Sequence, residues 1–125
     1  MNRNAEDENA VAQCSNATLE GRFVFTEAGF EPQEDKLVPF AITGYQDNAN
    51  GAAEGVGTYL VNGEINPPES FRGTYTVNAD CTGTVTYEDG TEFNLVTTPD
   101  GRMHTFVQTK PPGVVASGIA LRVGD

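Results

Sequence analysis

The chain has 125 residues, and its 18 acidic and 7 basic side chains give it a net charge of −11. Such an acidic surface repels phosphate groups, so we expect neither nucleic acid nor an anionic membrane as a partner. The sequence contains no apolar run of 18 residues, which argues against insertion of a helix into a membrane. With 14 glycines, 7 prolines and few helix-favouring stretches, the composition is typical of a single all-β domain.

Residues 1–13 are mostly Asn, Asp, Glu and Ala without periodicity, and we interpret them as a flexible N-terminal segment. The domain then spans residues 14–125. Within it, short alternating runs are separated by turn signals such as DNANG at 47–51, Asn62-Gly63 and Asp89-Gly90. These signals predict strands, joined mostly by tight hairpins, at residues 19–28, 37–46, 54–61, 70–78, 81–88, 91–98, 102–110 and 114–123.

Sequential antiparallel strands of this number either close into a barrel or fold over into a sandwich. Closure removes both exposed sheet edges, so we predict an all-β, eight-stranded antiparallel up-and-down β-barrel. The strand at 19–28 must then pair with the strand at 114–123. A barrel of this size is wide enough either for a filling of its own side chains or for one small ligand.

Alternation assigns one face of each strand to the interior. On the first strand this face holds Phe23, Phe25 and Glu27. On the last strand we assign the more apolar face to the interior, namely Val115, Ser117, Ile119, Leu121 and Val123. The aromatic residues that we expect to line the lumen and contact a ligand are Phe23, Phe25, Phe40, Tyr45, Tyr59, Phe71, Tyr75, Tyr87 and Phe93.

The third and seventh strands, at 54–61 and 102–110, are partly apolar on both faces, and the pattern leaves their orientation open. One face of these strands would then pack against a second copy of the chain or against the N-terminal segment. A homo-oligomer through the third or seventh strand is therefore an expectation of the sequence.

Glu27, Tyr75 and Tyr87 are the candidate catalytic group. Desolvation raises the pKa of a carboxyl inside an apolar barrel, and phenols can orient a carbonyl or an enolate. The alternative is that Glu27 lies in water at the open end of its strand. His104, the only histidine, is either a surface or half-buried side chain or a single acid–base group at the pocket mouth. The sequence has no GxSxG motif and no metal-ligand cluster, so we expect no triad, metal or cofactor.

Cys14 and Cys81 are the only cysteines and lie 67 positions apart, without a CxxC motif or a nearby histidine. This spacing leaves either a disulfide or two buried thiols. We favour the disulfide, which would stabilise the fold by about 4 kcal/mol on the chain-entropy account. A disulfide predicts an oxidising compartment, so we expect a secreted or periplasmic protein whose signal peptide has been removed.

Two segments resemble a signature of small secreted bacterial β-barrel proteins. CSNATLEGRF at 14–23 is similar to a Cys-Ser-Asn-Ala-Thr-Leu-x-Gly opening. GTYTVNADCTGTV at 73–85 is similar to the matched Gly-Thr-Tyr-Thr-Val-Asn-x-Asp-Cys-Thr-Gly-Thr segment. The resemblance covers nearly the whole domain from Cys14 onward. It implies the disulfide, the barrel and export, and it implies no activity.

The chain also resembles, more distantly, the calycins, the lipocalin and avidin class, in which a Gly-x-Trp on the first strand is covered by an Arg from the last. Gly21, Phe23 and Arg122 occupy the corresponding places, which implies a guanidinium stacked on the Phe23 ring at the barrel floor. Avidin-type biotin binding is not expected, because the chain has no tryptophan. Barrels of the allene oxide cyclase and spirotetronate cyclase kinds share the general architecture but no motif.

Three functions follow from these patterns. The first is an exported barrel that binds a small, largely apolar organic molecule in its lumen. The second is a cofactor-free cyclase or isomerase that shapes its substrate with Glu27 and the tyrosines. The third is a structural or adhesive module that self-assembles. The sequence identifies neither the ligand nor the pathway, and the lumen is either open or filled.

Overall fold

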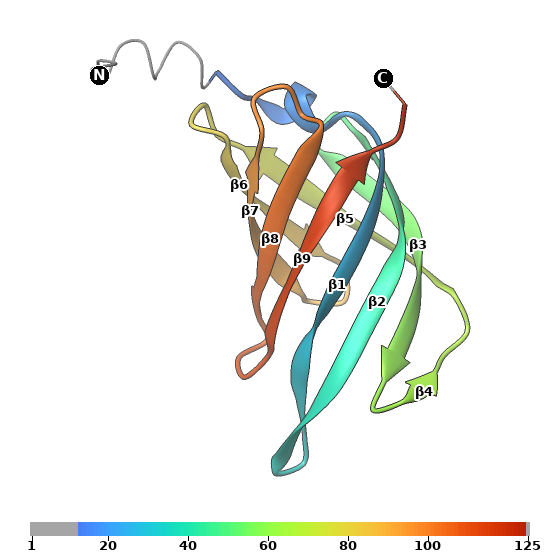
Figure 1. Cartoon of the computed structure of the whole chain (residues 1–125). Coiled ribbons are helices and arrows are strands. Elements are labelled where there is room, and N and C mark those ends of the chain that lie inside the picture. The colour runs from blue at the N-terminus through green and yellow to red at the C-terminus, as the bar shows by residue number, and fades with distance from the viewer. Residues whose placement is uncertain (1–12, 125) are drawn as a thin grey trace, which may run out of the picture.

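The predicted strands form a closed antiparallel barrel (Figure 1). The computed structural model describes residues 13–124, and the N-terminal segment predicted at 1–13 lies outside them except for Gln13. Within the described residues the chain forms a short 3₁₀ helix and nine strands. These are η1 (Asn16–Leu19), β1 (Gly21–Gln33), β2 (Lys36–Ala49), β3 (Ala52–Val61), β4 (Glu64–Ile65), β5 (Glu69–Val77), β6 (Thr82–Tyr87), β7 (Glu92–Thr97), β8 (Met103–Lys110) and β9 (Val115–Arg122).

Closure of the barrel depends on the pairing of its first and last long strands, and this prediction is confirmed. β1 pairs with β9 from Phe23 opposite Arg122 to Phe30 opposite Val115. β2 pairs with both β1 and β3, so the sheet returns on itself. The two-residue β4 pairs only with the end of β3 and adds no wall of its own.

The hairpin of β1 and β2 is longer than the sequence predicts. The two strands remain paired as far as Gln33 opposite Lys36, whereas the predicted strands end at 28 and begin at 37. Pro32 and the charged residues at 34–36 are typical of a loop, so the pattern predicts shorter strands. In the structure the two strands of this extension pair with each other there. The extended hairpin projects beyond the rest of the barrel at the end away from η1 (Figure 1).

The predicted interior face of the last strand is wrong. In β9 the inward residues are Ala116, Gly118, Ala120 and Arg122, whereas Val115, Ile119 and Leu121 are exposed. The reason is space inside the barrel. A Cβ built on Gly118 would lie 2.5 Å from Cζ of Phe106. Small residues therefore face the lumen where large rings from neighbouring strands already occupy it.

The two strands whose orientation the pattern left open are now assigned. β3 turns Gly55, Gly57 and Tyr59 inward, and β8 turns His104 and Phe106 inward. The opposite faces of both strands are partly exposed and partly apolar. Self-association through these outer faces stays a prediction.

Arg122 closes one end of the barrel. Its Nε donates to the carbonyl of Gly101 at 3.0 Å, its Nη2 donates to the carbonyl of Thr18 at 2.8 Å, and its Nη1 donates to the carbonyl of Glu20. The guanidinium also lies 4.8 Å from the centroid of the Phe23 ring, as the calycin resemblance implies. One side chain thus fixes η1, the β7–β8 turn and the first strand together.

The disulfide is present and reinforces the same end. Cys14 is bonded to Cys81, with the two Cα atoms 5.0 Å apart. It ties the segment before η1 to the turn that precedes β6. Leu19, at the end of η1, is only 2% exposed and plugs the barrel beside this bridge. Within residues 13–124 no helix is long and apolar enough to cross a bilayer.

Replacing Arg122 should destabilise the protein far more than replacing another arginine. Arg122→Met keeps the apolar stem but leaves three carbonyls without their donors, so we expect a loss of about 3 kcal/mol in the free energy of unfolding. Urea denaturation would measure this loss. Arg102→Met, at an exposed position nearby, is the control and should cost less than about 0.5 kcal/mol. Equal losses in the two variants would contradict the closing role of Arg122.

Candidate functional site

The lumen contains a cavity of about 1100 Å³. Most of its wall is built from inward side chains of the long strands, and it extends from Phe23 near the closed end to Glu31 and Tyr59 near the other end. Its lining also includes residues on the outer faces of β2, β3 and β5, such as Asp47, Glu54 and Arg72. Of the aromatic residues predicted to line the lumen, all except Tyr45 and Tyr75 are inward side chains of this wall. Tyr45 lies on the outer face of β2, so its predicted orientation is wrong. The barrel therefore encloses space in addition to its packed side chains.

Five aromatic rings form a continuous chain across the cavity wall. Neighbouring rings meet edge to face, with centroids 5.4 to 5.9 Å apart. This geometry is the favourable one for aromatic pairs, so the rings hold each other in place. We call this set the aromatic chain; in order from β1 through β5, β6 and β7 to β8, it consists of Phe25, Phe71, Tyr87, Phe93 and Phe106.

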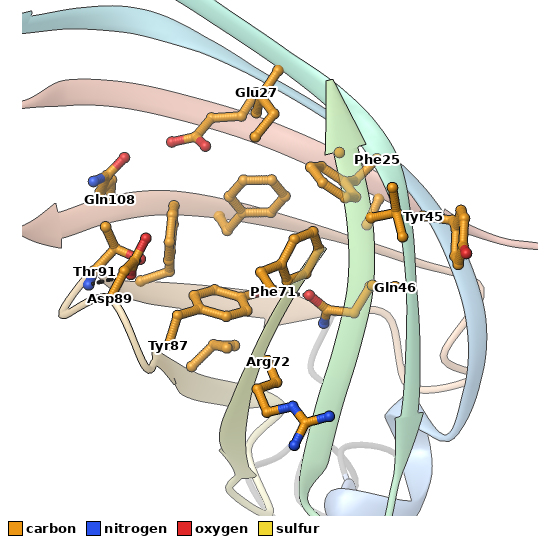
Figure 2. Close-up of a pocket in the computed structure, with 18 of the residues that line it drawn as sticks. Phe25, Glu27, Tyr45, Gln46, Phe71, Arg72, Tyr87, Asp89, Thr91 and Gln108 are labelled. Atoms are coloured by element: carbon orange, nitrogen blue, oxygen red, sulfur yellow. Dashed lines mark hydrogen bonds between the residues drawn. The ribbon is translucent and has the colours of Figure 1, made fainter. Parts of the chain in front are cut away.

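Two predicted site residues have surroundings different from those expected. The Tyr45 ring lies under the guanidinium of Arg22, 4.0 Å from it, and Figure 2 shows it apart from the other labelled rings. Tyr75 is 4% exposed and packs in the closed end, where its hydroxyl donates to the carbonyl of Asn16 at 3.5 Å. The structure thus does not bring Tyr75 together with Glu27.

Glu27 is a buried carboxyl that points into the cavity (Figure 2). It is only 7% exposed, and its Oε2 has no hydrogen-bond partner among the described residues. Its register neighbours, Ile42 on β2 and Gly118 on β9, have no side-chain donor to offer. Burial raises the pKa of Glu27 to about 7, because the charged form loses its hydration. The alternative of a water-exposed Glu27 is therefore wrong.

His104 lies deeper than either sequence interpretation allowed. It is 6% exposed, and its ring is 5.1 Å from that of Phe23, near the closed end. Its Nδ1 has no hydrogen-bond partner among the described residues. Burial, and secondarily the positive charge of Arg122, lower the pKa of His104 to about 4. It is therefore a neutral imidazole at pH 7, and it faces the same cavity as Glu27.

A line of buried hydrogen bonds runs from the cavity to η1. The hydroxyl of Tyr87 donates to Oε1 of Gln46, and Nε2 of Gln46 donates to Oδ1 of Asn48 at 2.9 Å. Nδ2 of Asn48 then donates to the carbonyl of Leu19 at 3.0 Å. Sequence reasoning missed both amides. Extending the alternation of the second strand past Ile42 would have placed them inside.

Tyr59 and Glu31 form a second polar pair, nearer the open end. The Tyr59 hydroxyl donates to a carboxylate oxygen of Glu31, and the Tyr59 ring packs on Phe40 with centroids 5.8 Å apart. Burial raises the pKa of Tyr59, and the bond to Glu31 adds to this shift. Sequence reasoning missed Glu31 because it lies beyond the predicted end of the first strand, although it continues the face of Glu27.

Comparisons with known proteins show the fold and no family. No protein-family model matches the chain, and no curated protein matches it. A solved structure similar to it is the redesigned β-barrel mFAP1 bound to DFHBI, with 16% identity and a TM-score of 0.54 over 86% of this chain and 97% of that one. The redesigned β-barrel mFAP0 bound to DFHBI has 19% identity and a TM-score of 0.53 over 84% and 99%. These likenesses define a small closed β-barrel.

The buried Glu27 should make the stability of the protein fall as pH rises. The folded state retains this proton up to about pH 7, whereas the unfolded chain releases it near the ordinary pKa of 4.5. The free energy of unfolding therefore falls between these two pH values by about 1.4 kcal/mol per pH unit. The full loss, reached above about pH 7, is about 3 kcal/mol. Glu27→Gln has no such proton, so its free energy of unfolding should rise relative to the unsubstituted protein between pH 4.5 and 8.

Urea denaturation at both pH values measures the difference between the two proteins. Glu64→Gln removes a carboxylate from the exposed β4 and is the control, for which the difference should stay constant. His104 has the opposite effect on stability: because its pKa is lowered in the folded state, it reduces the free energy of unfolding as pH falls below about 6.5. His104 is present in all three proteins, so its effect cancels in the comparison. A constant difference for Glu27→Gln would contradict the buried, uncompensated carboxyl.

Proposed function

We propose that this protein binds a small, largely apolar organic molecule in the lumen of its barrel. The observation that carries the proposal is the cavity of about 1100 Å³ whose wall includes the aromatic chain. Ligand sites of small molecules are typically about 300 to 1,000 Å³, mostly apolar, with a few convergent polar groups. Here the polar groups are Glu27, His104 and the hydroxyl of Tyr87, all of which face the cavity.

The solved structures with a similar fold support this use of the lumen. Both mFAP1 and mFAP0 are barrels bound to a small organic ligand, DFHBI. The closed end adds a second support, because Arg122, Leu19 and the disulfide hold the barrel shut there. A ligand would therefore enter from the opposite end, near Glu31 and Tyr59.

We also propose that the protein is exported, as the resemblance to small secreted bacterial barrels implies. The Cys14–Cys81 disulfide supports this location, because such bridges persist in oxidising compartments.

Filling the cavity at Gly57 should abolish ligand binding without unfolding the barrel. The nearest atoms to a Cβ built at Gly57 belong to Ile42, at 3.4 Å, whereas a Cβ at Gly55 would lie 2.0 Å from the carbonyl oxygen of Tyr45. Gly57→Phe can therefore project a ring into the lumen. We expect it to weaken binding of the neutral fluorescent probe N-phenyl-1-naphthylamine at least tenfold in a titration.

Thr58→Phe is the matched control, because the neighbouring residue of a strand faces the outside. It should bind the probe as tightly as the unsubstituted protein does, and thermal melts should show both variants folded. If the unsubstituted protein does not bind the probe, the lumen is not a site for apolar molecules.

A cofactor-free isomerase or cyclase is the second candidate function. The structure brings Glu27, Tyr87 and His104 to one cavity, although not Tyr75. The Glu27 pKa of about 7 favours this candidate, because a general acid or base works best when its pKa lies near the working pH. The neutral His104 adds a second group that can accept or donate a proton.

General-base activity of Glu27 can be measured as hydrogen–deuterium exchange at the α-carbons of enolisable ketones, such as 2-indanone, in D₂O. We expect the protein to accelerate exchange above buffer and Glu27→Gln to lose at least 100-fold of that acceleration, because removing a general base costs about this factor. Glu64→Gln should retain it. Equal rates for Glu27→Gln and the unsubstituted protein would remove Glu27 from any mechanism.

A further inference from the structure

The cavity wall carries a strong excess of negative charge. The residues that line the cavity and its rim include seven carboxylates and a single guanidinium, that of Arg72. Of these, Asp47, Glu54 and Arg72 lie on the outer faces of their strands. Two of these carboxylates have a basic partner, since Asp47 lies 2.7 Å from Arg22 and Glu54 lies 3.6 Å from Arg72. The carboxylates without a basic partner among the described residues are Glu27, Glu31, Glu69, Glu88 and Asp89.

Glu27 is the one of these carboxylates that lies inside the cavity without a hydrogen-bond donor. It is 7% exposed, and Oε2 is unpartnered among the described residues. The nearby tyrosine hydroxyls and the Gln108 amide each donate to another acceptor. The hydroxyl of Tyr59 donates to Glu31, that of Tyr87 donates to Gln46, and Nε2 of Gln108 donates to the carbonyl of Lys110 at 2.9 Å.

A ligand bound in the cavity can therefore supply a donor for Glu27. Burying a carboxylate without a hydrogen-bond donor or a counter-ion is energetically costly. A ligand group that donates to Glu27 removes this cost, and the gain adds to the binding free energy. Glu27 and three members of the aromatic chain, Phe25, Phe71 and Tyr87, line the same cavity (Figure 2). Ring faces attract a cation, and they also cover the apolar body to which the cation is attached. The negative charge of Glu27 and the aromatic wall thus both favour a cation attached to a flat apolar body.

We propose that the lumenal ligand is an organic cation, an ammonium group on a flat apolar body, with the ammonium paired to Glu27 and the body packed on the aromatic chain. This inference rests on the proposed binding function and names its ligand class. A neutral molecule of the same shape leaves Glu27 without its counter-ion. An anion of the same shape is repelled by the carboxylates of the wall.

Proton release accompanies binding of such a cation. Burial holds the pKa of Glu27 near 7, and a paired ammonium lowers it, so binding at pH 6 displaces a proton. The other titratable groups that face this part of the cavity are Glu31 on the same strand, Tyr59 on β3, Tyr87 on β6 and His104 on β8. Both tyrosines stay protonated across the range, because burial raises the pKa of each, and His104 stays neutral.

Three naphthalene probes of matched size test the proposal: 2-naphthylmethylamine, 2-naphthylmethanol and 2-naphthoate. Fluorescence titration at pH 8 should give a dissociation constant for the amine at least tenfold below that of the alcohol, with the carboxylate binding weakest. Calorimetry of the amine at pH 6 in buffers of different ionisation enthalpy should show a proton released on binding. This second measurement needs no variant.

Glu27→Gln should remove the preference for the amine over the alcohol, whereas Glu64→Gln should keep it. Glu27→Met provides the same test if the glutamine variant does not fold. An alcohol that binds as tightly as the amine to the unsubstituted protein, or an amine preference that survives in Glu27→Gln, would overturn the ligand class.

The outcomes also distinguish the proposed ligand class from the proposed binding of apolar molecules in the lumen. Binding of the neutral N-phenyl-1-naphthylamine or of the naphthyl alcohol without any preference for the amine overturns only the ligand class. Failure of all four probes to bind overturns both.

Discussion

The register between β1 and β9 is the constraint on which the rest of the barrel depends. Phe23 lies opposite Arg122, and the guanidinium packs on the ring and binds carbonyls of η1 and of the β7–β8 turn. A slip by one residue would turn every side chain of a strand to the other face. Because Arg122 has partners on three segments at once, such a slip would break all of them together. The contacts of Arg122 therefore fix the closure of the barrel, its closed end and the direction in which its side chains face.

The interior is uneven around its circumference, and this unevenness creates the site. The aromatic chain covers the side formed by β5, β6, β7 and β8, together with Phe25 of β1. β2, β3 and β9 contribute small inward residues, namely Gly44, Gly55, Gly57, Ala116, Gly118 and Ala120. Large rings against small residues leave space where large against large would have filled it. Glu27 lies on β1 between β2 and β9, where its register neighbours Ile42 and Gly118 offer no side-chain donor, which is why it is buried without one.

The sequence predicted the eight strands of the barrel wall in their order, the closure, the disulfide and the Phe23–Arg122 stack, because turn spacing and local motifs carry that information, but not the two-residue β4. It predicted Glu27 and most of the lumenal rings through alternation. It did not predict the inward face of β9, since alternation separates two faces but does not say which is inside. That choice depends on the Phe106 ring of another strand. The burial of His104 and the roles of Gln46 and Asn48 likewise depend on packing between strands distant in sequence.

The hydrogen bonds that run from Tyr87 through Gln46 and Asn48 to Leu19 all have the same direction. Each group donates its hydrogen bond toward the closed end of the barrel, and the last acceptor is the backbone carbonyl of Leu19, which cannot donate. The phenol oxygen therefore offers the cavity a lone pair and no hydrogen. Together with the carboxylate that Glu27 presents above about pH 7, it gives this part of the cavity two acceptors for a ligand that carries N–H or O–H groups.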